Sequence, residues 1–193
     1  MDLKKFTSKG FYKTKIPEKS WKMIQDILAN HIHEKAPEYS DVHKVNLKSW
    51  IKSEKFEIAS DFLSLEKFPD FKKQVISEMY DLLSEWSGAK LNPNGIVYGI
   101  RFYKNGATLG MHTDLKKTHH ISVNMSVALD GEPWLFDIVD HDGNEHNVLI
   151  EPGECVYYES ALCLHGRKTP FNGNYYANMY CHFTLESDVL PTK

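Results

Sequence analysis

Apolar residues recur at helical spacing in two stretches of the first half of the chain. One stretch covers residues 17–33, where Pro17 suits a first helical turn. The other covers residues 65–86 and is followed by Gly88, a typical helix stop. The positions that recur every three or four residues are Trp21, Ile24, Ile27, Leu28, Phe68, Phe71, Val75, Met79, Leu82, Leu83 and Trp86. The pattern predicts two amphipathic helices, each with one apolar stripe to bury. Between them, Val45, Leu47, Trp50 and Ile51 stand among lysines, and this segment is irregular or a short strand.

After Gly88 the period changes to short runs rich in Val, Ile, Tyr and Phe. Turn dipeptides separate the runs: Asn105-Gly106, Asp130-Gly131, Asp142-Gly143 and Asn172-Gly173. The predicted strands are 96–103, 108–112, 121–129, 134–139, 147–150, 154–158 and 175–185. Such regular spacing is typical of an antiparallel sandwich or jelly roll. Helices followed by strands indicate an α+β fold.

The length of 193 residues suits one domain, and we find no internal repeat or low-complexity linker. We therefore expect a single domain over 1–193, with 1–90 as mainly helical support and 91–193 as the β core.

The net charge of −3 argues against nucleic acid or an anionic membrane as partner. The first residues lack the apolar stretch of a signal peptide, and no window is apolar enough to span a bilayer. The expected location is the cytoplasm.

The chain has three cysteines, Cys155, Cys163 and Cys181, all in its C-terminal third. An odd number without paired spacing favours reduced, buried thiols over a disulfide framework. A Cys/His zinc site is the alternative, but the chain has no CxxC pair.

His112 and Asp114 are the strongest candidates for chemistry. Two residues apart on an extended segment, they project to the same face. Together with the distant His165 they can supply two imidazoles and one carboxylate, a set that leaves positions open on iron for O2. The plain alternative is that HxD marks a surface turn.

The other histidines form no comparable set. His119 and His120 are adjacent and face opposite sides of a strand, and His182 alternates with Cys181 on the last strand as a structural residue. His141 and His146 flank the Asp142-Gly143 turn, where we expect them to be solvated, and the cluster of Asp140, His141 and Asp142 is interpreted as a hairpin tip.

Several ordered blocks carry a resemblance. They are Tyr98-Gly-Ile-Arg101-Phe-Tyr103, His112-Thr-Asp114, Glu132-Pro-Trp134, Asp140-His-Asp-Gly143, Glu151-Pro-Gly153, Tyr158-Glu-Ser160, His165-Gly-Arg167 and Tyr176-Ala-Asn178-Met-Tyr-Cys-His-Phe183. In this order they resemble the prolyl 4-hydroxylase-like group of Fe(II)/2-oxoglutarate-dependent dioxygenases, over roughly the last hundred residues.

The resemblance implies a double-stranded β-helix, a jelly roll with iron at its mouth and the N-terminal helices packed on one sheet. It implies Fe(II), 2-oxoglutarate and O2 as cofactor and cosubstrates, with ascorbate as a possible reductant. The reaction it implies is hydroxylation of a C–H bond while 2-oxoglutarate is converted to succinate.

By position, His112, Asp114 and His165 match the three iron ligands of the family. Tyr103 matches a tyrosine that contacts 2-oxoglutarate, and its alternative role is an ordinary core aromatic.

The chain departs from the family where the far carboxylate of 2-oxoglutarate binds. Many prolyl hydroxylases place Lys or Arg nine or ten residues after the last histidine, but here Asn174 and Tyr175 occupy these positions. A buried carboxylate needs a cationic partner. The candidates are Arg167 and then Arg101, with hydrogen bonds from Asn124 and Asn178.

The substrate class rests on the resemblance, which implies a prolyl residue in a peptide or protein. The aromatic residues Trp134, Phe136, Tyr157 and Tyr158 could form a wall for its ring or belong to the core. A free amino acid or small metabolite is the alternative substrate.

The alternative function is a non-catalytic jelly-roll module that binds a metal or ligand. It is motivated by Asn174, which stands where a cation for the cosubstrate is usual. A cupin dioxygenase is a third alternative, but it would carry HxH instead of HxD.

Overall fold

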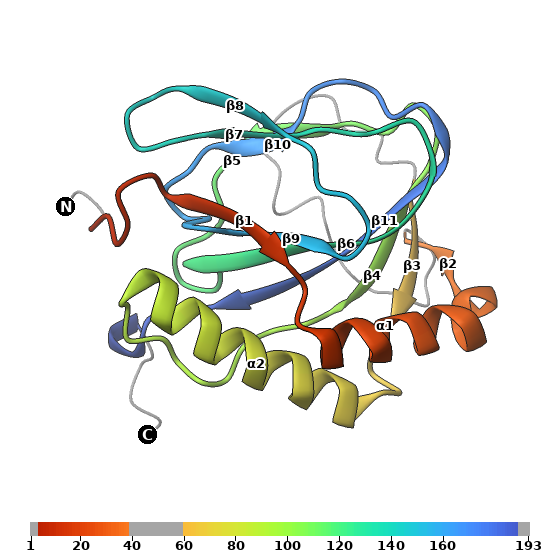
Figure 1. Cartoon of the computed structure of the whole chain (residues 1–193), viewed down its shortest axis with the longest axis horizontal. Coiled ribbons are helices and arrows are strands. Elements are labelled where there is room, and N and C mark those ends of the chain that lie inside the picture. Colours follow the sequence, from red (N-terminus) through yellow and green to blue (C-terminus); the bar gives the residue numbers. More distant parts are fainter. Residues whose placement is uncertain (1–3, 39–59, 189–193) are drawn as a thin grey trace.

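The computed structural model describes residues 4–38 and 60–188, which form two facing antiparallel sheets and two helices. In Figure 1 the helices lie beneath the larger sheet, and the smaller sheet lies on the opposite side. The larger sheet has the order β1-β9-β6-β11-β4-β3-β2, and the smaller has the order β5-β10-β7-β8. The strands are β1 (Phe11–Lys15), β2 (Ala36–Pro37), β3 (Ser60–Ser64), β4 (Gly99–Tyr103), β5 (Leu109–His112), β6 (Ile121–Gly131), β7 (Phe136–Val139), β8 (Glu145–Val148), β9 (Glu154–Tyr158), β10 (His165–Arg167) and β11 (Gly173–Phe183).

From β4 to β11 the chain passes back and forth between the two sheets, which is the topology of a jelly roll. The two helices cover the outer face of the larger sheet. The predicted α+β jelly roll with helices on one sheet is therefore confirmed.

Both predicted helices are present: α1 (Glu18–His31), which continues as a short 3-10 helix (Ile32–Glu34), and α2 (Pro69–Ser87). The second helix begins four residues later than predicted. Pro69 is its first residue, and a residue before proline avoids helical geometry. Gly88 ends α2 with a left-handed φ of 63°.

All seven predicted strands exist within a few residues of their expected bounds, but four others were not predicted: β1, β2, β3 and β10. The first three join the larger sheet, where β1 and β2 form its two edges, so residues before 90 supply strands as well as helices. β10 has only three residues, too few for a visible alternation. The segment with Val45 to Ile51 lies outside the described residues.

The two central strands of the larger sheet carry different side chains on their two faces. On β6, Val123 and Met125 belong to the apolar core between the larger sheet and the helices. Ser122, Asn124 and Ser126 alternate with them and point into the space between the two sheets. β11 repeats this with Tyr176, Asn178, Tyr180 and His182 on the inner face. The space between the sheets is therefore lined by buried polar groups.

No helix in the described ranges is long and apolar enough to cross a bilayer. The described part of the chain ends in a short 3-10 helix (Glu186–Asp188) after β11.

Candidate metal centre

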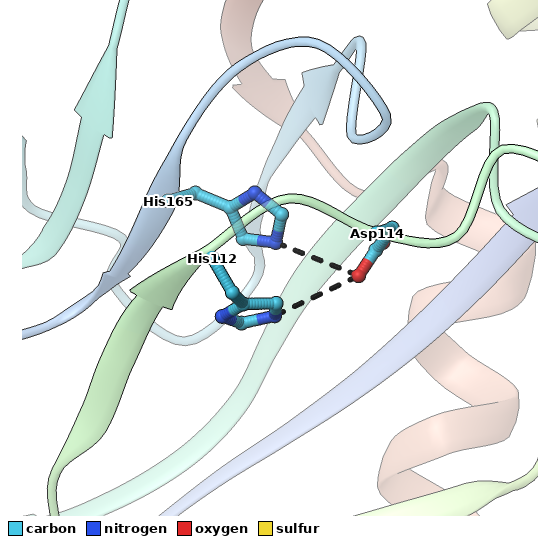
Figure 2. A group of neighbouring side chains, drawn as sticks. All are labelled: His112, Asp114 and His165. Atoms are coloured by element: carbon cyan, nitrogen blue, oxygen red, sulfur yellow. Dashed lines mark ion pairs between the residues drawn. The ribbon is translucent and has the colours of Figure 1, made fainter. Parts of the chain in front are cut away.

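The structure brings His112, Asp114 and His165 together between the sheets (Figure 2). β5 and β10 pair so that His165 stands opposite His112, with their ring centroids 4.5 Å apart. Asp114 follows just beyond the end of β5, and its Oδ1 lies 3.6 Å from His112 Nε2 and 3.9 Å from His165 Nε2. One ligand atom from each residue lies within 4.8 Å of the others, so the group can hold a metal ion.

Both histidines present a bare nitrogen to the centre. His112 Nδ1 lies 2.8 Å from the carbonyl oxygen of Gly110, and His165 Nδ1 lies 2.8 Å from that of Cys163. A carbonyl oxygen can only accept, so each Nδ1 carries the proton and donates it. Each Nε2 is left with a lone pair aimed at Asp114, which is the tautomer that metal binding requires.

Burial sets the charges of this group. Burial, together with the neighbouring His112, lowers the pKa of His165 to about 3, so the ring is neutral at physiological pH. Burial raises the pKa of Asp114, while the nearby His119 and His112 oppose the increase. A divalent cation would stabilise this desolvated carboxylate.

Arg167 is a fully buried cation two residues after His165 on the same strand face. Its guanidinium lies 4.3 Å from the ring centroid of Tyr176 and 4.6 Å from that of Trp134. It donates to the carbonyl of Trp134 and, over 2.7 Å, to the hydroxyl of Tyr176. In the described part of the chain, no carboxylate lies within ion-pair distance of it, and its Nε has no hydrogen-bond partner.

Asn124 and Asn178 face each other across β6 and β11, where the Asn178 amide donates to Asn124 Oδ1 over 3.0 Å. Nδ2 of Asn124 and Oδ1 of Asn178 are buried without a partner among the described residues. Tyr103 is fully buried in a cluster with Trp134 and Tyr176, on β4 next to the strand that carries Asn178. We call Asn124, Asn178, Tyr103 and Arg167 the buried polar cluster. Its unpartnered donors are Asn124 Nδ2 and Arg167 Nε, its unpartnered acceptor is Asn178 Oδ1, and the unpartnered donors suit an anionic ligand.

Two predicted residues have other partners. Arg101 forms an ion pair with the buried Glu38, with two distances of 3.0 and 2.9 Å from its Nε to the carboxylate oxygens, so its charge is already balanced. Asn174 is exposed near the start of β11, where its amide donates to Asp130 over 2.9 Å. Its side chain is not part of the buried polar cluster.

The aromatic residues divide between the two sides of the larger sheet. Trp134 lies over Arg167, and Phe136 and Tyr158 pack on the His165 ring at centroid distances of 5.9 and 4.7 Å. Tyr157 belongs to the core between the larger sheet and the helices, so it does not contribute to a wall around the metal centre.

The sequence analysis gave Ser122 and Ser160 no role and interpreted His182 as structural, but all three are buried and hydrogen-bonded beside Asp114. For Ser122 the signal was present in the strict alternation of polar and apolar residues along residues 121–127. The expectation that His141 is solvated is wrong: its side chain is 5% exposed, and its Nε2 lies 3.0 Å from a carboxylate oxygen of the buried Glu159.

No family model matches the sequence, and no curated protein matches it either. Solved structures with the same fold are found at low identity. A prolyl-4-hydroxylase from Pseudomonas putida is 13% identical, with a TM-score of 0.62 over 93% of this chain and 94% of its own. A prolyl hydroxylase from Trichoplax adhaerens, solved with a peptide fragment of the hypoxia inducible factor oxygen degradation domain, is 6% identical, with a TM-score of 0.63 over 93% of this chain and 85% of its own.

A third structure of this fold is the non-heme alpha ketoglutarate-dependent epimerase SnoN of nogalamycin biosynthesis. It is 10% identical, with a TM-score of 0.60 over 92% of this chain and 78% of its own. The chain thus shares the fold of 2-oxoglutarate oxygenases whose reactions differ from one another. At these identities the likeness concerns the fold.

Proposed function

We propose that this protein is an Fe(II)- and 2-oxoglutarate-dependent dioxygenase that hydroxylates a C–H bond. One observation carries the proposal: Arg167, a buried cation without a carboxylate partner among the described residues, lies two residues after the metal ligand His165. A metal site with open positions beside a buried cation is what a chelating dicarboxylate requires.

Each residue has a distinct part in this proposal. The Nε2 atoms of His112 and His165 and a carboxylate oxygen of Asp114 would hold Fe(II). With 2-oxoglutarate and O2 bound, iron held by these residues would supply the oxidising power for C–H hydroxylation, and ascorbate would serve as an external reductant. The carbonyls of Gly110 and Cys163 keep the two imidazoles in the binding tautomer.

Arg167 would bind the far carboxylate of 2-oxoglutarate. Its fork is held in place by Trp134 and Tyr176, which is the preorganisation that favours binding of a carboxylate. The unpartnered Nδ2 of Asn124 offers a further donor, and Asn178 and Tyr103 belong to the same buried polar cluster. Arg101 has a smaller part because Glu38 already neutralises it.

The finer proposal is that the hydroxylated group is a prolyl residue in a peptide or protein. Two of the similar structures are prolyl hydroxylases, one of them solved with a peptide fragment. The likeness to an epimerase of antibiotic biosynthesis favours a small-molecule substrate as the alternative.

Succinate formation tests the activity. The protein is incubated with Fe(II), 2-oxoglutarate, ascorbate and O2, with proline-containing peptides, free proline or no acceptor, and succinate is measured. We expect formation that depends on Fe(II), is lost in His165→Ala, and is greatest with peptides. Turnover with free proline alone would favour the small-molecule alternative. Saturable 2-oxoglutarate binding without any turnover would favour the non-catalytic module.

Binding of 2-oxoglutarate tests the role of Arg167. Titration into the Mn(II)-loaded protein, followed by tryptophan fluorescence and calorimetry, should show that Arg167→Met weakens binding by about a hundredfold or more, because a charge-assisted fork is lost. Lys168→Met removes the adjacent exposed cation, which pairs with Glu145, and should bind as wild type does.

Urea unfolding of ligand-free Arg167→Met provides the check on folding. Because the substitution removes a buried charge, we expect a free energy of unfolding within about 1 kcal/mol of wild type. Normal 2-oxoglutarate affinity in a folded Arg167→Met protein would remove Arg167 from the binding site.

A further inference from the structure

A chain of three hydrogen bonds runs through buried side chains beside Asp114. His182 Nδ1 lies 2.7 Å from Ser122 Oγ, and Ser122 Oγ lies 2.7 Å from Ser160 Oγ. Ser160 Oγ lies 3.0 Å from the carbonyl oxygen of His119. Ser122 and Ser160 are fully buried, so water does not compete for these hydrogen bonds.

The last acceptor fixes the direction of the whole chain. The carbonyl of His119 can only accept, so Ser160 donates its one hydroxyl hydrogen there. Ser160 must then accept from Ser122, and Ser122 must accept from His182 Nδ1. Each hydroxyl donates once and accepts once, and the imidazole has a defined tautomer.

Ser160 also holds the backbone that carries Asp114. Its carbonyl accepts from the amide of Asp114 over 2.8 Å, and the next amide, of Ala161, donates to the carbonyl of His120 over 3.3 Å. Including the Ser160 hydroxyl bond, the loop from Asp114 to His120 is fastened to residues 160 and 161 at three points. Both ends of the ligand-bearing loop are therefore fixed.

The two oxygens of the Asp114 carboxylate have different surroundings. Its Oδ1 faces the two ligand histidines, while its buried Oδ2 lies 3.9 Å from His182 Nδ1 and makes no hydrogen bond of standard geometry among the described residues. Because the relay hydrogens are committed elsewhere, the relay holds the loop in place and leaves both carboxylate oxygens available. Such a carboxylate can bind a cation through either oxygen.

We propose that His182, Ser122 and Ser160 form a positioning relay that holds Asp114 in its metal-binding orientation. The inference rests on the metal centre of the proposed function but not on 2-oxoglutarate chemistry. The three residues act through Asp114. They extend the centre from three residues to six, contributed by β5, β6, β10, β11 and the loops between them.

Metal binding alone tests the relay, with Mn(II) affinity from calorimetry and the visible spectrum of the Co(II) form as readouts. Ser122→Ala and His182→Leu should each weaken Mn(II) binding by about ten- to a hundredfold and alter the Co(II) spectrum, as loss of supporting hydrogen bonds does in other metal sites. His182→Asn keeps a donor near the position of Nδ1 and should restore most of the affinity.

Ser126→Ala is the matched control. Ser126 lies on the same inner face of β6 and is equally buried, but its hydroxyl has no partner among the described residues. Its Mn(II) affinity and Co(II) spectrum should equal those of wild type. Circular dichroism of each metal-free variant establishes that it is folded.

The outcomes separate the two proposals. Wild-type protein that binds no Mn(II) or Co(II) would contradict the metal centre and the relay together. Wild type that binds both ions, with unchanged affinity and spectrum in folded Ser122→Ala and His182→Leu, would overturn the relay and leave the proposed function intact. Loss of metal-free stability with an unchanged Co(II) spectrum would also overturn it, because that is the effect of a purely structural hydrogen bond.

Discussion

At the scale of single residues, short-range backbone contacts prepare the metal centre. Each ligand histidine donates a hydrogen bond from Nδ1 to the carbonyl oxygen two residues earlier in the chain, that of Gly110 for His112 and that of Cys163 for His165. The tautomer is therefore set by local geometry, before any metal binds. Arg167 differs because its charge has no local partner and depends on the packing of Trp134 and Tyr176.

The three cysteines permit a prediction at the same scale. All are free and buried, and burial raises the pKa of the Cys155 and Cys163 thiols to about 12 and that of Cys181 above its ordinary value. At pH 8 a thiol with such a pKa is ionised in only about one molecule in ten thousand, and the thiolate is the reactive form.

We therefore expect native protein to react slowly with a thiol reagent at pH 8, and all three cysteines to react rapidly in concentrated guanidinium. Counting labelled sites by mass spectrometry over time checks this. Rapid labelling of the native protein would show that at least one thiol is accessible.

At the scale of elements, the short strand β10 carries both the metal ligand His165 and Arg167 of the buried polar cluster. Its three residues, His165, Gly166 and Arg167, pair with both β5 and β7. Gly166 lies so close to β5 that an added Cβ would be 2.6 Å from the carbonyl oxygen of Leu109 and 2.8 Å from that of Gly110. The absence of a side chain there lets β5 bring His112 opposite His165.

Gly166→Ala should therefore push β5 away and weaken Mn(II) binding at least tenfold, with a loss of about 1–3 kcal/mol in the free energy of unfolding. Titration calorimetry and urea unfolding measure the two effects. Gly88→Ala is the control: it strains a left-handed position at the end of α2 at a cost of about 1–2 kcal/mol. Its Mn(II) affinity should be unchanged. Equal metal affinity in both variants would contradict the role of the close approach.

At the scale of the whole molecule, the metal centre ties together segments that are far apart in sequence. His112 and Asp114 come from β5 and the loop after it, and His165 comes from β10. A metal bound only by the folded state stabilises the fold by mass action. Both ligand histidines lie on the smaller sheet, whereas the Asp114 amide is hydrogen-bonded to Ser160, which follows β9 of the larger sheet, so the metal centre links the two sheets.

Mn(II) at about 100 times its Kd should stabilise the protein by about 2.7 kcal/mol, or an increase in Tm of about 5–11 °C for a chain of this size. Differential scanning calorimetry measures the shift, and a chelator should reverse it. His112→Ala and His165→Ala should show none. A wild-type shift retained in both variants would place the metal elsewhere.

The fold class could be predicted because it depends on repeated local patterns. Helical spacing indicated α1 and α2, and turn dipeptides delimited seven strands. Of the strands that were missed, β1 and β2 lie at the edges of the larger sheet, and β2 and β10 are too short for alternation to carry information. β3 lies inside the sheet, but its residues, Ser60–Ser64, do not alternate between polar and apolar.

The sequence by itself determined the local parts of the candidate site: the HxD pair, whose spacing on a strand places both side chains on one face, and the resemblance that singled out His165 and Arg167. Only the tertiary structure decided that Arg101 is neutralised by Glu38, that Asn174 is exposed, and that Ser122, Ser160 and His182 surround Asp114. The reason is physical. Strand geometry acts over a few residues, whereas the register between strands and the burial of charge depend on how the whole chain packs.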